Sequence, residues 1–204
     1  MERKINQFLF LYPIKEYFDA EVERDKNLID LPEKEFRKFY SNLLNECISK
    51  RYRDGGFSIN YVTFKDEPAE IVKIKEKDRV ISNGITFADH VQSWLYPDPD
   101  FILNQLPKPL GHLRLAGFHA WDCVERVAKR AYERGIDVLV DEDLTQWLIP
   151  HYFQDPNFKI DSYPGFNPHV LKSPGIFRDF ISARKNKPWL WQKYQKNNVP
   201  GTCF

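Results

Sequence analysis

The sequence predicts an α/β protein, a three-layer α/β/α sandwich with a mainly parallel sheet. Several short runs of apolar residues are continuous rather than alternating, which is typical of strands buried on both faces. Between them lie segments with apolar residues at three- and four-residue steps, as in amphipathic helices. Because strands and helices alternate along the chain, right-handed crossovers and parallel pairing are expected.

The first half of the chain supplies a buried strand and a long helix. The strand is expected over 8–12 and ends at Pro13. The helix begins after Asp30, a candidate N-cap, with Pro32 in the first turn and Glu33 at the capping-box position. Its apolar stripe comprises Phe36, Phe39, Tyr40, Leu43, Leu44, Cys47, Ile48 and Tyr52. Two glycines at 55–56 end it.

The second half continues the alternation up to Thr145. The expected elements are strand 57–64, strand 79–82, short helix 101–106, strand 112–118, helix 122–134 and strand 136–140. Beyond Thr145, the prolines at 150, 156, 164, 168 and 174 interrupt the pattern and leave one candidate helix over 176–184. We therefore expect an α/β core over 1–145 and an irregular extension over 146–204 that packs on the same domain.

Composition limits the function classes. A chain of 204 residues with 42% hydrophobic and 15% aromatic residues fits one ordered domain. The net charge of +1 makes nucleic-acid binding unlikely by electrostatics alone. No apolar run approaches the roughly 18 residues of a membrane span. Three cysteines without disulfide or zinc spacing, and a start without a secretory pattern, lead us to expect a cytoplasmic protein with reduced thiols.

The C-terminal tail has a local charge of its own. From Arg178 to Phe204 it contains six Lys or Arg against one Asp, a net charge of +5, while the remainder carries −4. It also contains Trp189, Trp191 and Tyr194. Such a segment packs its aromatic rings on its own domain or docks onto a protein or nucleic acid. The sequence leaves both alternatives open.

Cys123 is the candidate nucleophile. It follows a predicted buried strand and opens a predicted helix, where free N–H groups and the helix dipole favour an anion. This position would lower the pKa of the thiol and could supply donors to an oxyanion. Without a neighbouring lysine, we expect only mild activation. A small packed core residue is the simpler alternative.

The residues around Cys123 resemble a known family. The segment 117–124, Gly-Phe-His-Ala-Trp-Asp-Cys-Val, is similar to the Gly-Val-x-Thr-Asp-x-Cys-Val signature of isochorismatase-like cysteine hydrolases, which include nicotinamidases. The resemblance continues through 128–135 and 137–145, over about 35 residues in all. It implies the same α/β sandwich, a homo-oligomer, and a small-molecule ligand near Cys123 contacted by residues such as Phe18, His119, Ala120 and Trp121.

The resemblance also shows what is missing. The family uses an aspartate after the first strand as general base and a lysine after the third strand to support charge. Pro13 and Asn83 stand at these two positions, and Ala120 replaces the threonine of the signature. A proline accepts no proton, and a neutral amide does not replace a cation.

Other groups near the signature are weaker candidates. His119, Asp122, His90 and Asp89 are the nearest in sequence that could act as base, and Glu16 lies three residues beyond Pro13. The histidines, at 90, 112, 119, 151 and 169, show no metal-ligand spacing, and no glycine-rich phosphate loop is present. We therefore expect no metal and no cofactor.

Three functional hypotheses follow from these observations. The leading one is a divergent isochorismatase-like protein that has lost the hydrolase triad and has a binding or structural role. The second is a cysteine hydrolase acting on a small amide or related carbonyl compound, with Cys123 as nucleophile and a different base. The third is an interaction module that uses the basic, aromatic tail. We also expect a homo-oligomer, with the region after Thr145 in the contact, and no membrane association.

Overall fold

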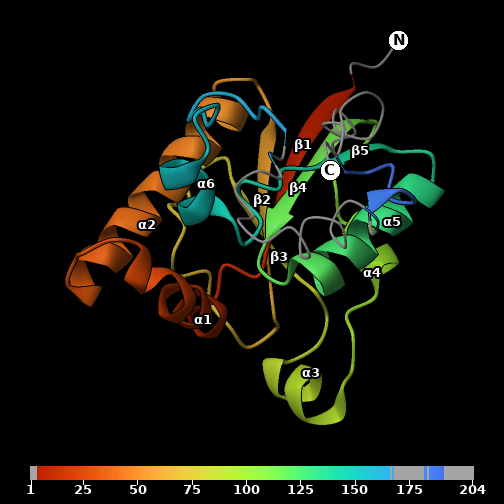
Figure 1. The fold of residues 1–204 in the computed structure, drawn as a ribbon. Coiled ribbons are helices and arrows are strands. Elements are labelled where there is room, and N and C mark those ends of the chain that lie inside the picture. Colours follow the sequence, from red (N-terminus) through yellow and green to blue (C-terminus); the bar gives the residue numbers. More distant parts are fainter. Residues whose placement is uncertain (1–3, 166, 168–181, 183, 191–204) are drawn as a thin grey trace.

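A computed structural model describes residues 4–165, 167, 182 and 184–190. At its centre lies a five-stranded sheet in the order β3-β2-β1-β4-β5, with every neighbouring pair parallel (Figure 1). The strands are β1 (Ile5–Leu11), β2 (Ser58–Thr63), β3 (Arg79–Ser82), β4 (Leu110–Gly117) and β5 (Asp137–Val140). The predicted parallel α/β fold is confirmed.

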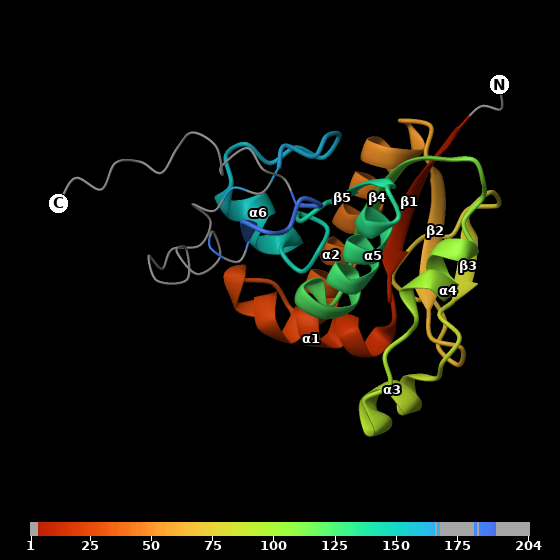
Figure 2. The ribbon, with the colours of Figure 1, turned by 90° about the vertical axis from the view of Figure 1, so that its right-hand side faces the viewer.

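Helices cover both faces of the sheet. The helices α1 (Lys15–Asp25), α2 (Glu33–Ile48) and α6 (Leu148–Gln154) lie on one face, and α4 (Pro99–Asn104) and α5 (Glu125–Glu133) lie on the other (Figures 1 and 2). The short helix α3 (Phe87–Ser93) projects beyond the sheet, on the side where the strands end (Figure 2). These layers form the expected sandwich.

The central strand explains why the sheet is buried on both sides. Residues 8–11 of β1, Phe-Leu-Phe-Leu, are each 0% exposed, so side chains on both faces of the strand enter the core. At its end Leu11 pairs with Val62 of β2 and with Gly117 of β4. The three strands therefore end level with one another, and the residues that follow them meet at one edge.

Three helices were not predicted, for local reasons. The helix α1 buries only a few apolar residues among charged ones, and α3 has just seven residues behind a capping box formed by Thr86 and Asp89. In α6, Pro150 is the third residue, within the first turn, where a proline removes no helical hydrogen bond. The prediction that Pro150 interrupts regular structure was therefore wrong.

Two predicted helix starts also differ. Residues 122–124 of the predicted helix 122–134 belong to a π-helical turn, Ala120–Val124, and α5 begins at Glu125. The long helix starts after Pro32 rather than Asp30, and a second π-helical turn, Ser49–Arg53, continues it. Most of the candidate helix 176–184, together with Trp191 and Tyr194, lies outside the described residues.

The described part of the extension contacts the core. The backbone N–H of Val140 donates to the carbonyl of Trp189 at 2.9 Å, and Lys187 pairs with Glu125 at 2.6 Å. Trp189 is 6% exposed. In this stretch the tail packs on its own domain, as the first alternative supposes. Within the described residues, no helix is both long and apolar enough to cross a membrane.

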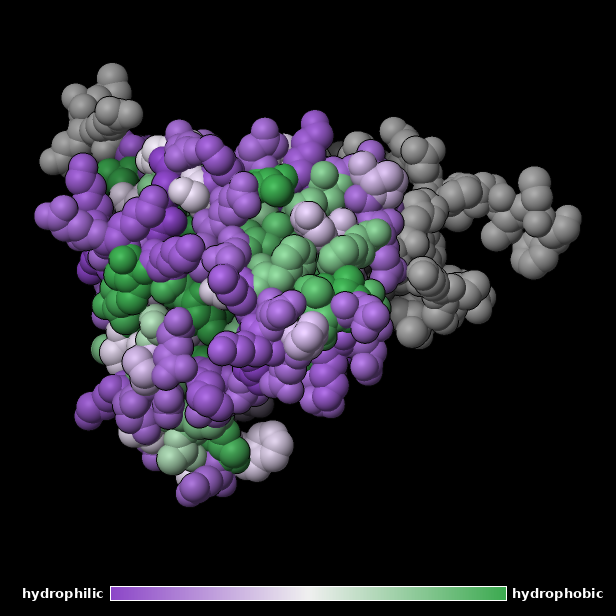
Figure 3. Space-filling view, turned by 90° about the vertical axis from the view of Figure 1, so that its left-hand side faces the viewer, coloured by the Kyte–Doolittle hydropathy of each residue, from purple (hydrophilic) through white to green (hydrophobic). Residues whose placement is uncertain are grey.

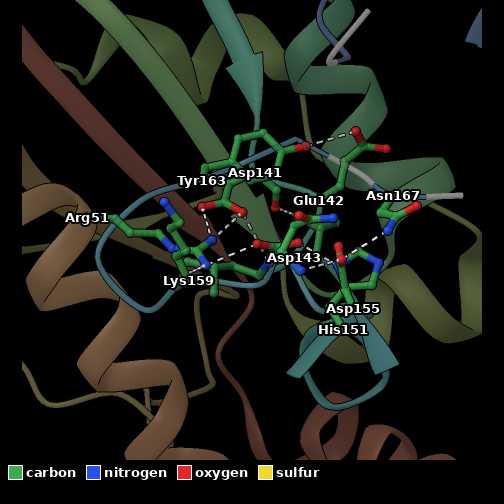
Figure 4. A network of polar contacts seen from close by, with 12 residues as sticks. Arg51, Asp141, Glu142, Asp143, His151, Asp155, Lys159, Tyr163 and Asn167 are labelled. Carbon is green, nitrogen blue, oxygen red and sulfur yellow. Dashed lines mark hydrogen bonds and ion pairs between the residues drawn. The ribbon is translucent and has the colours of Figure 1, made fainter. Parts of the chain in front are cut away.

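A buried ionic network anchors the extension near the end of β5 (Figure 4). Arg51 pairs with Asp141 and with Asp143, each at 3.0 Å, and all three side chains are at most 1% exposed. His151 of α6 contacts Asp143 at 2.5 Å. The carboxylates after β5 therefore join the turn that continues α2, the end of β5 and the extension through buried polar contacts.

Candidate functional site

The candidate site lies at the carboxyl edge of the sheet. From the central β1, the chain order runs through β2 to β3 on one side and through β4 to β5 on the other. The switch point therefore falls between β1 and β4, where open α/β sheets bind ligands. Tyr12 and Pro13 follow β1 at this point, Asn83 follows β3, and the turn containing Cys123 follows β4.

Backbone hydrogen bonds fix these residues just beyond their strands. The N–H of Tyr12 donates to Val62 O at 2.7 Å, and the N–H of Asn83 donates to Thr63 O at 2.9 Å. The N–H of Phe118 donates to Leu11 O at 3.1 Å. The ladder thus continues one residue past β1, β3 and β4, so the site residues are attached directly to the sheet.

Cys123 is a buried thiol in the π-helical turn Ala120–Val124, and it is 3% exposed. Burial and, to a smaller extent, the neighbouring charge of Asp122 raise its pKa to about 12, while Arg126 and a hydrogen bond with Tyr12 act in the opposite direction. The expectation of mild activation by a helix terminus was wrong in direction. The thiol stays protonated because burial outweighs the local dipole.

Tyr12 occupies the space beside Cys123 at the end of β1. It has φ of 61°, in the left-handed region, and is 1% exposed. Burial raises its pKa well above the usual value, its proximity to Cys123 adds to this, and a hydrogen bond with the Asn83 amide lowers it. The adjacent Pro13 is buried and offers only its carbonyl, which accepts from Glu70 N–H at 3.0 Å. The end of β1 therefore presents a neutral phenol to Cys123 and no carboxylate.

Asn83, which the sequence comparison aligns with the family's lysine, is 2% exposed. Its Oδ1 accepts from the N–H of Ile85 at 3.1 Å. Its amide also faces the Tyr12 hydroxyl, and this contact lowers the Tyr12 pKa. The hydroxyl of Tyr17 is buried without a hydrogen-bond partner among the described residues, and the centroid of its ring lies 4.2 Å from that of His119. One polar group at this edge of the sheet is thus left without a partner within the part of the protein described.

Two histidines complete the cluster. One ligand atom from each of His90 and His119 and the Cys123 sulfur all lie within 4.8 Å of one another. His90 comes from α3, and its Nδ1 is 2.9 Å from the carbonyl of Leu95. His119 has φ of 63°, and burial followed by the nearby His90 lowers its pKa. His119 is therefore neutral at pH 7.

The remaining candidates for a base lie apart from the thiol or are already paired. Asp122 binds Arg126 at 2.6 Å, and Asp89 forms the capping box of α3. Glu16 is exposed in the first turn of α1. Of the groups named from sequence, the structure therefore brings only the imidazoles of His90 and His119 close to Cys123 as possible proton acceptors.

The other predicted ligand contacts are placed as follows. The ring of Phe18 packs edge-on against Tyr40 at 5.3 Å, so it belongs to the interface between α1 and α2. The N–H of Ala120 donates to Gln146 Oε1 at 3.0 Å. The backbone of Trp121 lies in the π-helical turn, and its side chain lies outside the described part of the chain.

Sequence reasoning missed the parts of the site that depend on three-dimensional proximity. His90 is distant in sequence from Cys123 and reaches it because α3 projects past the ends of the strands. Tyr12 was treated only as the last residue of a strand. The available signal for its role was its place in the sequence. It is an aromatic residue directly before the position that aligns with the lost carboxylate.

Comparisons with known proteins give limited matches. No family model and no curated protein matches the chain. Among solved structures, it is similar to an N-carbamoylsarcosine amidase from Thermoplasma acidophilum, with 14% identity, coverage of 74% of this chain and 92% of that one, and a TM-score of 0.44. It is also similar to a putative Mar1 ribonuclease from Leishmania major, with 12% identity, coverage of 84% and 93%, and a TM-score of 0.44. The fold class itself follows from the sheet and its two helical layers.

Proposed function

We propose that this protein is a divergent, non-hydrolytic relative of the isochorismatase-like hydrolases and that the cluster around Cys123 binds a small ligand. The observation that carries the proposal is the set of groups at the three strand ends. Cys123 is protonated, the adjacent Tyr12 is a neutral phenol, and Pro13 and neutral Asn83 stand in place of the base and the cation. The hydroxyl of Tyr17 is buried without a partner among the described residues, which supports a polar ligand at this edge.

The lost groups are the physical reason why we expect no hydrolysis. A cysteine hydrolase needs a thiolate and a base that later activates water, and such proton transfers contribute roughly 10²–10⁴-fold each. A thiol with a pKa of about 12 is almost entirely protonated at neutral pH. A phenol whose pKa is raised above its usual value takes up no proton from it.

A hydrolase with a histidine base is the second candidate. It is favoured by one observation, the neutral His119 close to the Cys123 sulfur. Against it, the influences on the Cys123 pKa come from burial, Asp122, Arg126 and Tyr12, with no histidine hydrogen bond among them. An activated pair needs that hydrogen bond.

Assays of purified protein with nicotinamide and isochorismate test the proposal. We expect no turnover above the background of Cys123→Ala. The double variant Pro13→Asp with Asn83→Lys restores the acidic and basic groups at the family's positions, so it should recover a trace of Cys123-dependent activity. Robust turnover by the unmodified protein, abolished by Cys123→Ala, would overturn the proposal and support the histidine-based hydrolase.

The unpaired tyrosine hydroxyl gives an independent test. Tyr17→Phe removes a buried hydroxyl that has no partner among the described residues, so the free energy of unfolding of the ligand-free protein should stay the same or rise by up to about 1–3 kcal/mol. Tyr52→Phe is the matched control, because the Tyr52 hydroxyl donates to Asp141 at 2.6 Å and its loss should destabilise. If urea unfolding shows equal destabilisation in both variants, the Tyr17 hydroxyl does form a stabilising hydrogen bond in the ligand-free protein, and this support for a ligand site is lost.

A further inference from the structure

We propose that His90, His119 and Cys123 together form a binding site for a transition-metal ion of the Zn²⁺ class. This inference rests on the proposed function, because it identifies the ligand of the same cluster. The sequence spacing of the histidines indicates no such site. The fold creates it by placing α3 beside the turn that follows β4, so that the three donor atoms lie within 4.8 Å of one another.

The distances require only a small adjustment. Zn–N bonds of about 2.0–2.1 Å and a Zn–S bond of about 2.3 Å in a tetrahedron separate the donor atoms by about 3.4–3.6 Å. The donor atoms here, at most 4.8 Å apart, come within this range after side-chain movements of about 1 Å. Two imidazoles with one thiolate suit zinc better than magnesium or calcium, which prefer oxygen ligands.

The surroundings of His90 resemble those of a metal ligand. Its Nδ1 lies 2.9 Å from the carbonyl oxygen of Leu95, which can only accept, so Nδ1 carries the proton and donates it. The Nε2 lone pair is then free to bind a metal. Ligating histidines commonly donate their second ring N–H to a carbonyl in this way, which fixes both the tautomer and the ring orientation.

His119 and Cys123 are held in place by the same turn. The carbonyl of His119 accepts from the N–H of Asp122 at 3.2 Å and from that of Val124 at 3.3 Å. The His119 ring packs on Tyr17, with ring centroids 4.2 Å apart. The backbone of one residue thus orders the segment that carries the thiol, and both donors are fixed relative to the sheet.

The binding step is a simple exchange. The Sγ–H bond of Cys123 breaks, its proton passes to solvent, and the sulfur donates an electron pair to the metal, with no change of oxidation state. Three protein ligands leave the fourth tetrahedral position open to water or to a small molecule. A cysteine engaged in this way is a metal ligand and no longer a nucleophile, which agrees with the proposed function.

Metal binding is tested on the full-length protein after removal of bound metal with a chelator. Equilibrium dialysis against Zn²⁺ alone should show one ion per chain. Cys123→Ala, His90→Ala and His119→Ala should each weaken binding by more than about tenfold. His112→Ala is the matched histidine control, since His112 is exposed and pairs with Asp137, and it should bind Zn²⁺ as the unmodified protein does.

Substitution with Co²⁺ identifies the sulfur ligand. The unmodified protein and Cys47→Ala should show a thiolate-to-cobalt charge-transfer band, and Cys123→Ala should lack it. Cys47 is also a buried free thiol, so it is the appropriate cysteine control. Circular dichroism confirms that each variant is folded. Zinc binding that survives in Cys123→Ala, or no binding by the unmodified protein, would overturn the metal site.

Different experimental results would contradict the metal site and the proposed function. If the protein neither binds zinc nor hydrolyses the test substrates, the metal site is wrong and the non-hydrolytic proposal stands. If metal-free protein hydrolyses them in a Cys123-dependent manner, the proposed function is wrong whatever the dialysis shows.

Discussion

At the scale of single residues, the site depends on backbone conformations that cost free energy. Tyr12 and His119 lie in the left-handed region, with φ of 61° and 63°. Bulky side chains adopt it at a cost of roughly 1–2 kcal/mol each. Gly117, just before the site turn, has φ of 140°, and a Cβ there would lie 2.3 Å from the carbonyl oxygen of Leu11. Such strain at two site residues is typical of functional positions.

A glycine substitution tests how the turn is held. Gly117→Ala should lower the free energy of unfolding by more than about 3 kcal/mol, because the new methyl group would collide with the β1 backbone. Gly135→Ala is the matched control. Gly135 has φ of 72° but nothing within 4 Å of its Cβ position, so its substitution should cost only about 1–2 kcal/mol. If urea unfolding shows that both variants lose the same free energy of unfolding, the close packing of Gly117 against β1 is unimportant.

At the residue scale, sequence could indicate positions but not roles. It placed Cys123, Pro13 and Asn83 after apolar strands, where the structure has them, and their functional roles stay predictions. The direction of the Cys123 pKa shift could not be predicted, because it depends on how completely the turn is buried. The approach of His90 depends on a helix of seven residues, too short to give a periodic signal.

At the scale of elements, buried ion pairs connect α2, β5 and the extension. Arg51 lies between Asp141 and Asp143 (Figure 4). Arg51→Met should lower the free energy of unfolding by about 3–5 kcal/mol, because two carboxylates would lose their buried cation. Lys50→Met is the neighbouring control, since Lys50 pairs with Asp54 at 3.5 Å on the surface, where a salt bridge contributes at most about 1 kcal/mol. A loss below about 1 kcal/mol for Arg51→Met in urea unfolding would contradict this role.

The elements themselves were predicted where hydrophobic pattern decides structure. The strand 79–82 matches β3 residue for residue, and the other strands differ at their ends by one to three residues, most of all at the start of β1. Helices such as α1, which are stabilised by tertiary contacts rather than by a wide apolar stripe, could not be found in this way. The division at residue 145 into core and extension stays a prediction.

At the scale of the whole molecule, many buried groups keep their protons in the folded state. Burial raises the pKa of Cys47, Cys123 and Tyr61 to about 12 and that of Tyr40 well above its usual value. The unfolded chain releases these protons near pH 8.5 to 10, so above that range it binds fewer protons than the native state, and stability falls as pH rises. We expect a loss of at least about 3 kcal/mol between about pH 8 and pH 11, measured by urea unfolding. Unchanged stability over this range would show that these groups ionise freely when folded.

The predicted homo-oligomer remains to be tested. The face that carries α1, α2 and α6 has apolar side chains among polar ones (Figure 3). Beyond Thr145, Tyr152 and Phe153 of α6 are 37% and 46% exposed and contact Phe39 of α2. Sedimentation at micromolar concentration should show an oligomer that Phe153→Glu weakens, whereas Val91→Glu on α3 leaves it intact. A monomeric unmodified protein would contradict the prediction.

The most direct test of the whole account is the ionisation of the Cys123 thiol in metal-free protein. Alkylation rates are measured against pH, with mass spectrometry of the labelled peptide to separate Cys123 from the other cysteines. We predict that the rate at Cys123 keeps rising past about pH 10 without a plateau, because burial and Asp122 hold the thiol protonated. A plateau below about pH 7 would demonstrate a thiolate at neutral pH and contradict the proposal that this site binds rather than hydrolyses.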